Sequence, residues 1–192
     1  LGIAIARTTT SPVLYPVRLV ATIYTDIFRG MPLLLALFLV GLGIPGLRLS
    51  FVPNSAVFLG TIALVLTYSA YVAEVIRAGI EGVNPTQRQA ARALGLSHPQ
   101  TLRHVVLPQA FRNVTPPLLN DLVSLQKDSG LISVLGAVDA IRAAGIETAQ
   151  SFNFTPYVVA GGLFVLLTIP LTRYTDWLIR RQDRAQKAQG VF

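Results

Sequence analysis

Polar and ionisable side chains gather in one otherwise apolar stretch, residues 111–138. At helical spacing, Asn120, Ser124 and Lys127 fall on one stripe, and Asp121 and Asp128 fall close to it. An ionisable group at membrane depth is costly and normally faces a protein interior or a water-filled path. Amides, a hydroxyl and charges of both signs suit the binding of a polar solute, so the stripe predicts a solute pathway. The alternative is that Lys127 and Asp128 pair with each other or reach the membrane interface.

Two neighbouring features extend this hypothesis. Gly130 permits a break in the helix, and broken helices near the bilayer midplane often form transport sites. Ser69 lies between Tyr68 and Tyr71 near the end of another apolar segment. Tyrosines at such a position are usually interfacial, and a serine often bonds only a neighbouring helix. Ser69 is therefore a candidate for the pathway, with a structural role as the alternative.

Catalytic chemistry finds no support in the sequence. The two histidines, His98 and His104, are six residues apart and do not share a helical face, and there is no cysteine. The sequence has no G-x-x-x-x-G-K-[ST], G-x-S-x-G or H-E-x-x-H motif. We expect no catalytic residue, no metal site and no cofactor in this chain.

The elements that position the polar stripe follow from charge and hydropathy. The chain has 192 residues, of which 52% are hydrophobic and 13% charged, whereas a soluble domain has about a quarter charged. Residues 31–47, 55–73 and 148–172 contain no Lys, Arg, Asp or Glu, and runs of such length match the hydrocarbon core of a bilayer. The sequence predicts an all-α integral membrane protein; a large soluble helical core is the less favoured alternative.

The distribution of arginines predicts the topology. The net charge is +7, and the arginines cluster in residues 74–112 and 173–187, beside apolar spans. This pattern indicates two segments on the cytoplasmic side rather than a nucleic-acid-binding face. Between them, we expect residues 111–138 to run outward, residues 139–153 to form an external loop, and residues 154–179 to return.

The rest of the chain completes this arrangement. Residues 12–47 are too long for one crossing as a straight helix, and we expect a break at residues 28–32, where glycine and proline occur together. We predict about five transmembrane helices, the first one truncated at the N-terminus. They form a single domain, residues 1–192, which ends in a basic cytoplasmic tail, residues 180–192.

Residues 84–108 form a polar loop between two apolar segments. Asn84 and Pro85 predict the end of one helix and the start of a short one, which carries Arg88 and Arg92 and ends before Gly95. Residues 97–100 resemble the N-cap of a second short helix. We expect a compact knob that packs into a groove of another protein; an amphipathic helix lying on lipid is the alternative.

This loop resembles the EAA loop of ABC-importer permeases, whose pattern is EAA, three residues, Gly, nine residues, then I-x-L-P. Ala90, Ala91 and Gly95 fall in register, Val105 replaces the isoleucine, and Gln89 stands where glutamate is usual. Further segments resemble permeases of the polar amino-acid uptake family: residues 28–34 (FRGMPLL), 71–80 (YVAEVIRAGI), 107–111 (LPQAF), 117–127 and 133–136 (SVLG).

The resemblance implies a permease subunit in a prokaryotic inner membrane, with the loop and the C-terminus cytoplasmic. Its partners would be a second permease chain (an identical or a sister subunit), two cytoplasmic ATPase subunits that bind ATP and Mg, and an extracytoplasmic solute-binding protein. The solute would be an amino acid. The residues implied in coupling to the ATPase are Arg88, Gln89, Ala90, Ala91, Arg92 and Gly95.

Two other classes of protein remain as alternatives. A secondary transporter driven by an ion gradient should show an internal repeat and intramembrane carboxylates on several spans. A non-transporting membrane anchor or sensor subunit would not need the polar stretch at residues 111–129. Uptake without an ATPase would indicate the first, and the absence of reconstituted flux would indicate the second.

Overall fold

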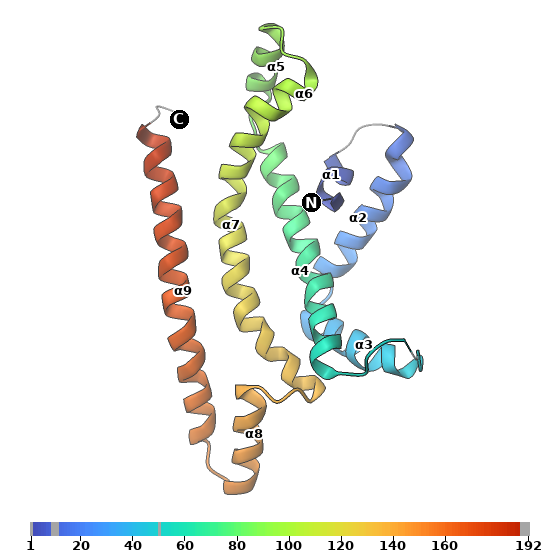
Figure 1. Ribbon diagram of the computed structural model, residues 1–192, viewed down its shortest axis with the longest axis vertical. Helices are drawn as coiled ribbons and strands as arrows, with labels where there is room; N and C mark the ends of the chain where they lie inside the picture. The colour runs from blue at the N-terminus through green and yellow to red at the C-terminus, as the bar shows by residue number, and fades with distance from the viewer. Residues whose placement is uncertain (1, 9–11, 50, 189–192) are drawn as a thin grey trace. The chain divides into compact units, whose positions relative to one another are not determined.

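The computed structural model describes residues 2–8, 12–49 and 51–188, and within these residues every regular element is helical (Figure 1). The elements are α1 (Gly2–Thr8), η1 (Pro12–Leu14), α2 (Tyr15–Gly30), α3 (Leu33–Gly46), α4 (Ala56–Glu81), α5 (Pro85–Ala93), α6 (His98–Thr101), the π-helix η2 (Leu102–Val106), α7 (Leu107–Asp128), the 3-10 helix η3 (Ser129–Leu135), α8 (Ala140–Ser151) and α9 (Thr155–Ala188). The predicted all-α class is confirmed.

Several helices are long and apolar enough to cross a bilayer. Helices α4 and α9 qualify alone, and two bent helix pairs raise the number to as many as four among the described residues. Helix α1, at the place of the expected truncated span, has only 7 residues. The count of about five spans therefore stays a prediction.

The break predicted at residues 28–32 is present. Helix α2 ends at Gly30, and α3 begins at Leu33. Pro32 has φ −57° and ψ 134°, an extended conformation, and its carbonyl accepts the N–H groups of Leu35 at 2.9 Å and Ala36 at 3.1 Å. Proline disfavours helical geometry in the residue before it, which explains why the chain cannot continue as one straight helix.

The described chain divides into two compact units. One contains residues 2–27, 70–121 and 177–188, and the other contains Phe28–Ser69 and Leu122–Asp176. Helices α2, α4, α7 and α9 each contribute residues to both units. The single domain expected from the sequence remains a prediction.

In the first unit, the end of α4 packs against the start of α7. Val83, Val106 and Ala110 form a buried apolar cluster, against which Ile80 packs. Ion pairs add a second connection, because Arg7 of α1 contacts Glu74 of α4. Along α4, the Arg77 guanidinium contacts Glu74 and Glu81, one turn away on either side.

Helix α9 forms a hydrogen bond with α7 at a backbone carbonyl whose usual helical donor position holds a proline. Pro116 lies inside α7 and has no N–H for the carbonyl of Arg112, four residues earlier. The side chain of Gln182 in α9 donates its Nε2–H to this carbonyl at 3.2 Å. A side chain of α9 therefore replaces the backbone donor that Pro116 removes from α7.

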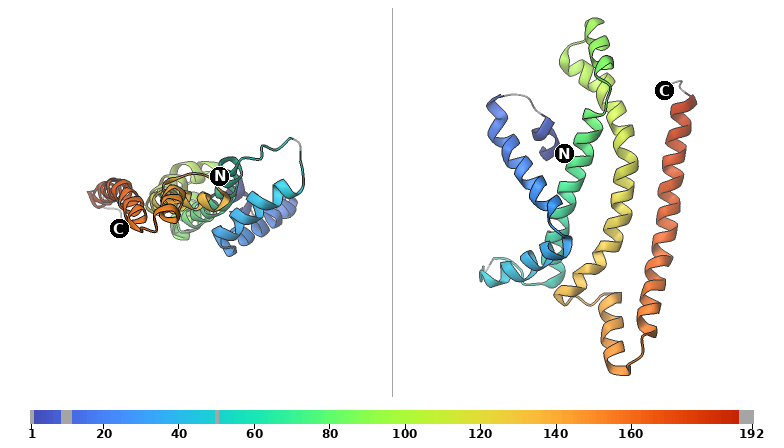
Figure 2. Two further views of the ribbon diagram at one scale, coloured as in Figure 1. Left: turned by 90° about the horizontal axis from the view of Figure 1, so that it is seen from below. Right: turned by 180° about the vertical axis from the view of Figure 1, so that it is seen from behind.

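In the second unit, η3 fits between other helices at two glycines. A Cβ on Gly60 of α4 would lie 2.6 Å from a methyl of Ile132, and one on Gly130 would lie 2.8 Å from Ile141 and 2.9 Å from Phe164. Only the absence of a side chain permits these approaches. Figure 2 shows α8 beside the first turns of α9 in the same unit.

Two details differ from the sequence-based expectations. The break expected at Gly130 is a change of helix type instead: α7 ends at Asp128, a 3-10 helix follows, and the chain turns at Gly136, which has φ +94°. Most of the loop expected at residues 139–153 is helix α8. The Asp139 side chain accepts the N–H of Arg142 at 2.8 Å, an N-cap that stabilises the start of this helix.

Candidate functional site

The polar loop, residues 84–108, folds into a pair of short helices. Figure 1 shows α5 and α6 side by side beyond the end of α4 and the start of α7. Asn84 defines the start of α5, because its Oδ1 accepts the N–H of Thr86 at 2.9 Å. Pro85 occupies the first turn, where its missing N–H costs nothing. Both signals are local in sequence, and the predicted helix is confirmed.

Gly95 ends α5 in the predicted way. Its φ is +84°, a left-handed conformation that favours glycine. The N–H of Leu96 bonds to the carbonyl of Ala91 at 3.2 Å, and the N–H of Gly95 bonds to that of Arg92 at 3.0 Å. This pair of hydrogen bonds is a Schellman motif, which satisfies the last carbonyls and fixes the direction of the chain.

The second helix of the loop continues into α7 through a π-helix. The Ser97 N–H donates to Gln100 Oε1 at 2.8 Å, which caps α6. Residues Leu102–Val106 then form η2, and the N–H of Leu107 bonds to the carbonyl of Leu102. Pro108 follows directly, and its ring would clash with the carbonyl of His104 in a regular α-helix. The wider π turn lets the chain pass this proline without ending the helix.

The predicted coupling residues divide between two faces of α5. Ala91 is buried against the rest of the first unit, whereas Gln89, Ala90, Arg92 and Gly95 are exposed. Arg88 differs from all of these, because its guanidinium donates to the backbone carbonyl of Ile80 in α4. The structure thus places four of the six on an accessible surface and two on the inner side.

Leu94 also lies among these exposed residues of α5, although no pattern in the sequence predicted a role for it. It is the C-cap residue of α5, and its side chain is 85% exposed. Burying a leucine stabilises a complex by about 1.5–3 kcal/mol, so an exposed one at the tip of a rigid helix suits a protein groove. The available signal in the sequence was its place directly before Gly95. We call Gln89, Ala90, Arg92, Leu94 and Gly95 the α5 surface.

The six pathway candidates do not form one described group. Asn120 and Asp121 belong to the first unit, and Ser69, Ser124, Lys127 and Asp128 belong to the second. In the second unit, the Tyr68 hydroxyl donates to Asp128 Oδ2 at 2.7 Å, and this bond joins α4 to α7. The Ser69 hydroxyl donates to the carbonyl of Leu66 in its own helix at 3.0 Å. This bond agrees with the structural alternative for the serine.

The charged residues of the stripe have different environments. Lys127 is exposed, and among the described residues no ion pair joins it to Asp128. Asp121 is half-buried, and its Oδ2 is buried with no hydrogen-bond partner in the described part of the chain. An unbonded buried carboxylate oxygen is costly, so this atom is a place where a donor or a cation would be stabilised.

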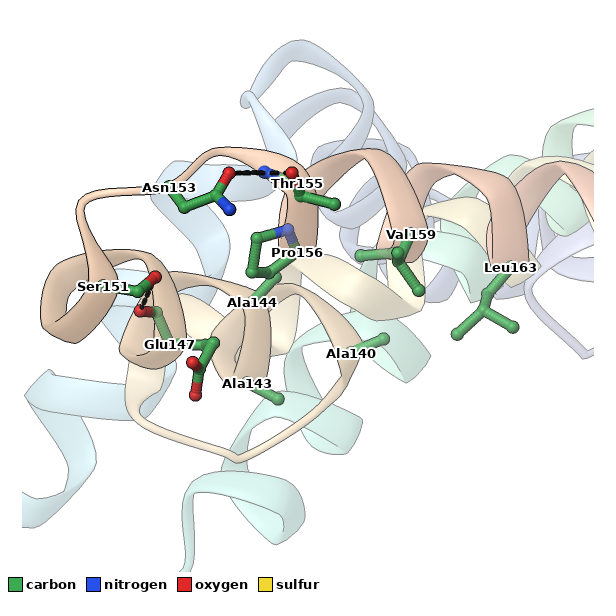
Figure 3. A pocket seen from close by; sticks show the side chains of 11 residues that line it. Ala140, Ala143, Ala144, Glu147, Ser151, Asn153, Thr155, Pro156, Val159 and Leu163 are labelled. Atoms are coloured by element: carbon green, nitrogen blue, oxygen red, sulfur yellow. Dashed lines mark hydrogen bonds between the residues drawn. The ribbon is translucent and has the colours of Figure 1, made fainter.

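An open pocket of about 540 Å³ lies in the second unit between α8 and the start of α9. Figure 3 shows Ala140, Ala143 and Ala144 of α8 on one wall and Val159 and Leu163 of α9 along another. Near its rim, Ser151 donates to the carbonyl of Glu147, and Thr155 donates to Asn153. None of the pathway candidates lines this mostly apolar pocket.

The described residues contain no group of side chains that could bind a metal ion. No three or more His, Asp or Glu side chains come together there in an arrangement that could hold an ion. The imidazole Nδ1 of His104 lies 3.0 Å from the carbonyl of Gln100, within its own helical turn.

Similarity to known proteins covers most of the chain, not only the polar loop. The chain is 38% identical to the arginine transport system permease protein ArtQ of Bacillus subtilis over 154 residues, which cover 80% of this chain and 69% of that protein. It is 35% identical over 188 residues to the probable glutamine ABC transporter permease protein GlnM of the same organism, covering 96% of this chain and 84% of that protein.

Solved structures show the same fold. A structure titled "Crystal structure of an amino acid ABC transporter with histidines" superposes with a TM-score of 0.84 at 36% identity, covering 93% of this chain and 81% of that one. The MetNI methionine ABC transporter, at 18% identity, superposes with a TM-score of 0.68 and shares the fold.

The family described as binding-protein-dependent transport system inner membrane component matches residues 1–184 of the chain. The match therefore spans the helices, the polar loop between α4 and α7, and the polar stretch of α7. The chain belongs to this family of integral membrane transport components.

Proposed function

We propose that this chain is the permease subunit of an ATP-driven importer of polar amino acids, and that the α5 surface docks into a cleft of an ATPase subunit. The observation that carries the docking role is a short helix fixed at both ends by caps, with Leu94 85% exposed beside Gln89, Ala90 and Arg92. A rigid helix loses little conformational freedom on binding, so its exposed leucine contributes fully to the affinity.

The family indicates which subunit hydrolyses ATP. In ABC importers a separate subunit hydrolyses ATP, so this chain is not itself an enzyme. The solute class is proposed from relatives named for arginine and glutamine transport and from a related structure titled as an amino acid transporter. Two copies of this chain, or this chain and a sister subunit, would form the pathway with two ATPase subunits and an external binding protein.

The proposed orientation places the α5 surface and the C-terminal end of α9 in the cytoplasm. The arginines at residues 88–112 and the basic residues from Arg173 onward support this orientation, because positive charge is retained on the inner side. Residues 139–153, which include α8, would then face the binding protein.

The proposed pathway runs along the polar face of α7. Asp121 supports it most directly, since its unbonded Oδ2 can accept a donor from the ammonium group that every amino acid carries. Asn120 and Ser124 add hydrogen-bonding groups one helical turn apart on this helix. Lys127 and Asp128 complete the candidates, and Ser69 has a weaker claim because it already bonds within α4.

The docking role is tested by the variant Leu94→Asp. Burying a leucine contributes about 1.5–3 kcal/mol, so its loss corresponds to at least about a tenfold loss of affinity. Affinity purification of the tagged permease should therefore recover little ATPase from membranes that contain the variant. The amount of permease in the membrane should not change, because Leu94 makes no buried contact.

Phe152→Asp serves as the matched control. Phe152 is also an exposed apolar C-cap residue, 90% exposed, but it ends α8. This variant should retain its ATPase subunits. Equal recovery of the ATPase with both variants would contradict the proposed docking surface.

A further inference from the structure

Arg88 makes an unusual contact for a residue of a docking helix. Its Nη2 donates to the backbone carbonyl of Ile80, eight residues earlier and in α4. Its Nε is buried and has no hydrogen-bond partner among the described residues. The guanidinium therefore turns toward the end of α4 and away from the exposed α5 surface.

The carbonyl of Ile80 is suited to receive a cation. Helix α4 ends at Glu81, so Ile80 belongs to the last turn, whose carbonyls lack partners within the helix. The C-terminal end of a helix also carries a partial negative charge, which an arginine neutralises. Arg88 thus caps the C-terminal end of α4 with a side chain from α5.

The capped turn is also the point at which α4 packs on α7. The side chain of Ile80 packs against three buried residues: Val83, which follows α4, Val106 at the end of η2, and Ala110 in α7. One residue of α4 therefore receives Arg88 through its backbone and contacts the α7 cluster through its side chain. A displacement of α5 would act on both helices at this point.

We propose that Arg88 is a positioning residue for transport: it couples movement of α5 to α4 and does not itself bind the ATPase. The inference rests on the proposed function, in which an ATPase moves α5. Gly95 and Asn84 fix the geometry of α5 itself, whereas Arg88 fixes α5 to the membrane helix. Without this contact, α5 would follow the ATPase without displacing α4 to the same extent.

The test uses the complete transporter, reconstituted with its ATPase subunits and binding protein in proteoliposomes. The measured quantity is the number of solute molecules imported for each ATP hydrolysed. With Arg88→Gln we expect the ATPase to co-purify in wild-type amounts. We expect the coupling ratio to fall by about fivefold or more, because coupling between two sites of a protein typically changes an equilibrium by at least this factor. A wild-type ratio in this variant would overturn the proposal.

Arg88→Lys tests the proposed chemistry and remains informative if the glutamine variant does not accumulate. An ammonium group can donate to the same carbonyl and neutralise the same helix end. We expect its coupling ratio to stay within about twofold of the wild type, a difference of under 0.5 kcal/mol. A lysine variant that assembles normally but has lost coupling would also overturn the proposal.

Arg103→Gln is the matched control, because Arg103 is an exposed arginine of the same loop, in η2. It should leave both the ATPase content and the coupling ratio unchanged. If Arg88→Gln loses the ATPase subunits while Arg88→Lys keeps them, Arg88 contacts the ATPase directly and the positioning role is wrong.

The two proposals fail in different ways. Normal ATPase recovery and uptake with Leu94→Asp would contradict the docking role of the loop. Loss of coupling with Leu94→Asp but not with Arg88→Gln would contradict only the role of Arg88.

Discussion

Individual residues of the polar loop have roles that are set by backbone geometry as much as by side-chain chemistry. Gln89 stands where the related loops usually have glutamate, and in this structure it is exposed on α5. Nothing in the structure explains the glutamine at this position. Ala91 and Gly95, in contrast, are explained by burial of the alanine and by the left-handed φ of the glycine.

Gly95 gives the sharpest prediction at this scale. In the variant Gly95→Val, a β-branched residue must adopt φ +84°, which costs about 1–3 kcal/mol and removes the Schellman end of α5. We expect uptake to fall by about tenfold, measured with labelled solute, while immunoblots show normal amounts in the membrane.

Asparagine at the same position is the control. Asparagine tolerates the left-handed conformation better than other non-glycine residues, so Gly95→Asn should keep most of the uptake. Equal losses with valine and asparagine would show that the conformation of residue 95 is not what the loop requires.

The residues that sequence alone could identify are those whose signals are local. Asn84, Gly95 and the Ser97–Gln100 cap lie within four residues of the groups that they bond. The contact from Arg88 to Ile80 joins two helices across a turn, and no spacing rule predicts it. The sequence placed Arg88 in the polar loop. Only the structure shows that its guanidinium points toward α4.

At the scale of elements, α7 depends on a neighbouring helix to remain regular. Pro116 and Pro117 remove two hydrogen-bond donors from its interior, and Gln182 of α9 bonds the carbonyl of Arg112 that Pro116 leaves without its usual partner. A typical intramolecular hydrogen bond of this kind contributes about 0.5–1.5 kcal/mol to stability.

A double-mutant cycle tests this dependence. Gln182→Ala should lower the Tm of the purified permease by about 1–6 °C, since 1 kcal/mol corresponds to about 2–4 °C at this size. In the background Pro116→Ala, the restored N–H satisfies Arg112, and Gln182→Ala should then have little effect. Additive losses in the two backgrounds would contradict the proposed repair.

The existence of most helices was predictable, whereas their ends and types were not. Charge-free runs and the break near Pro32 identify α3, α4 and α9 because hydropathy and proline act locally. Helix α8 has too little apolar periodicity to be recognised. The 3-10 helix η3 packs against Gly60 and Phe164, which lie far away in the sequence, as well as against the nearby Ile141.

At the scale of the whole molecule, the orientation in the membrane can be measured simply, because the chain contains no cysteine. Single cysteines at the exposed positions 93 and 152 provide probes in the polar loop and at the end of α8. A membrane-impermeant maleimide should label position 152 in intact cells and position 93 only in inverted vesicles. Labelling of position 93 from outside would reverse the proposed topology.

In the proposed transporter, solute movement through this chain is driven by a separate ATPase bound to the α5 surface. The direct measurement is the uptake of labelled arginine and glutamine into proteoliposomes that contain the permease, its ATPase and its binding protein. We predict accumulation of at least one of the two solutes that requires ATP and all three components, and that Leu94→Asp abolishes. Accumulation driven by an ion gradient alone, without the ATPase, would instead identify a secondary transporter.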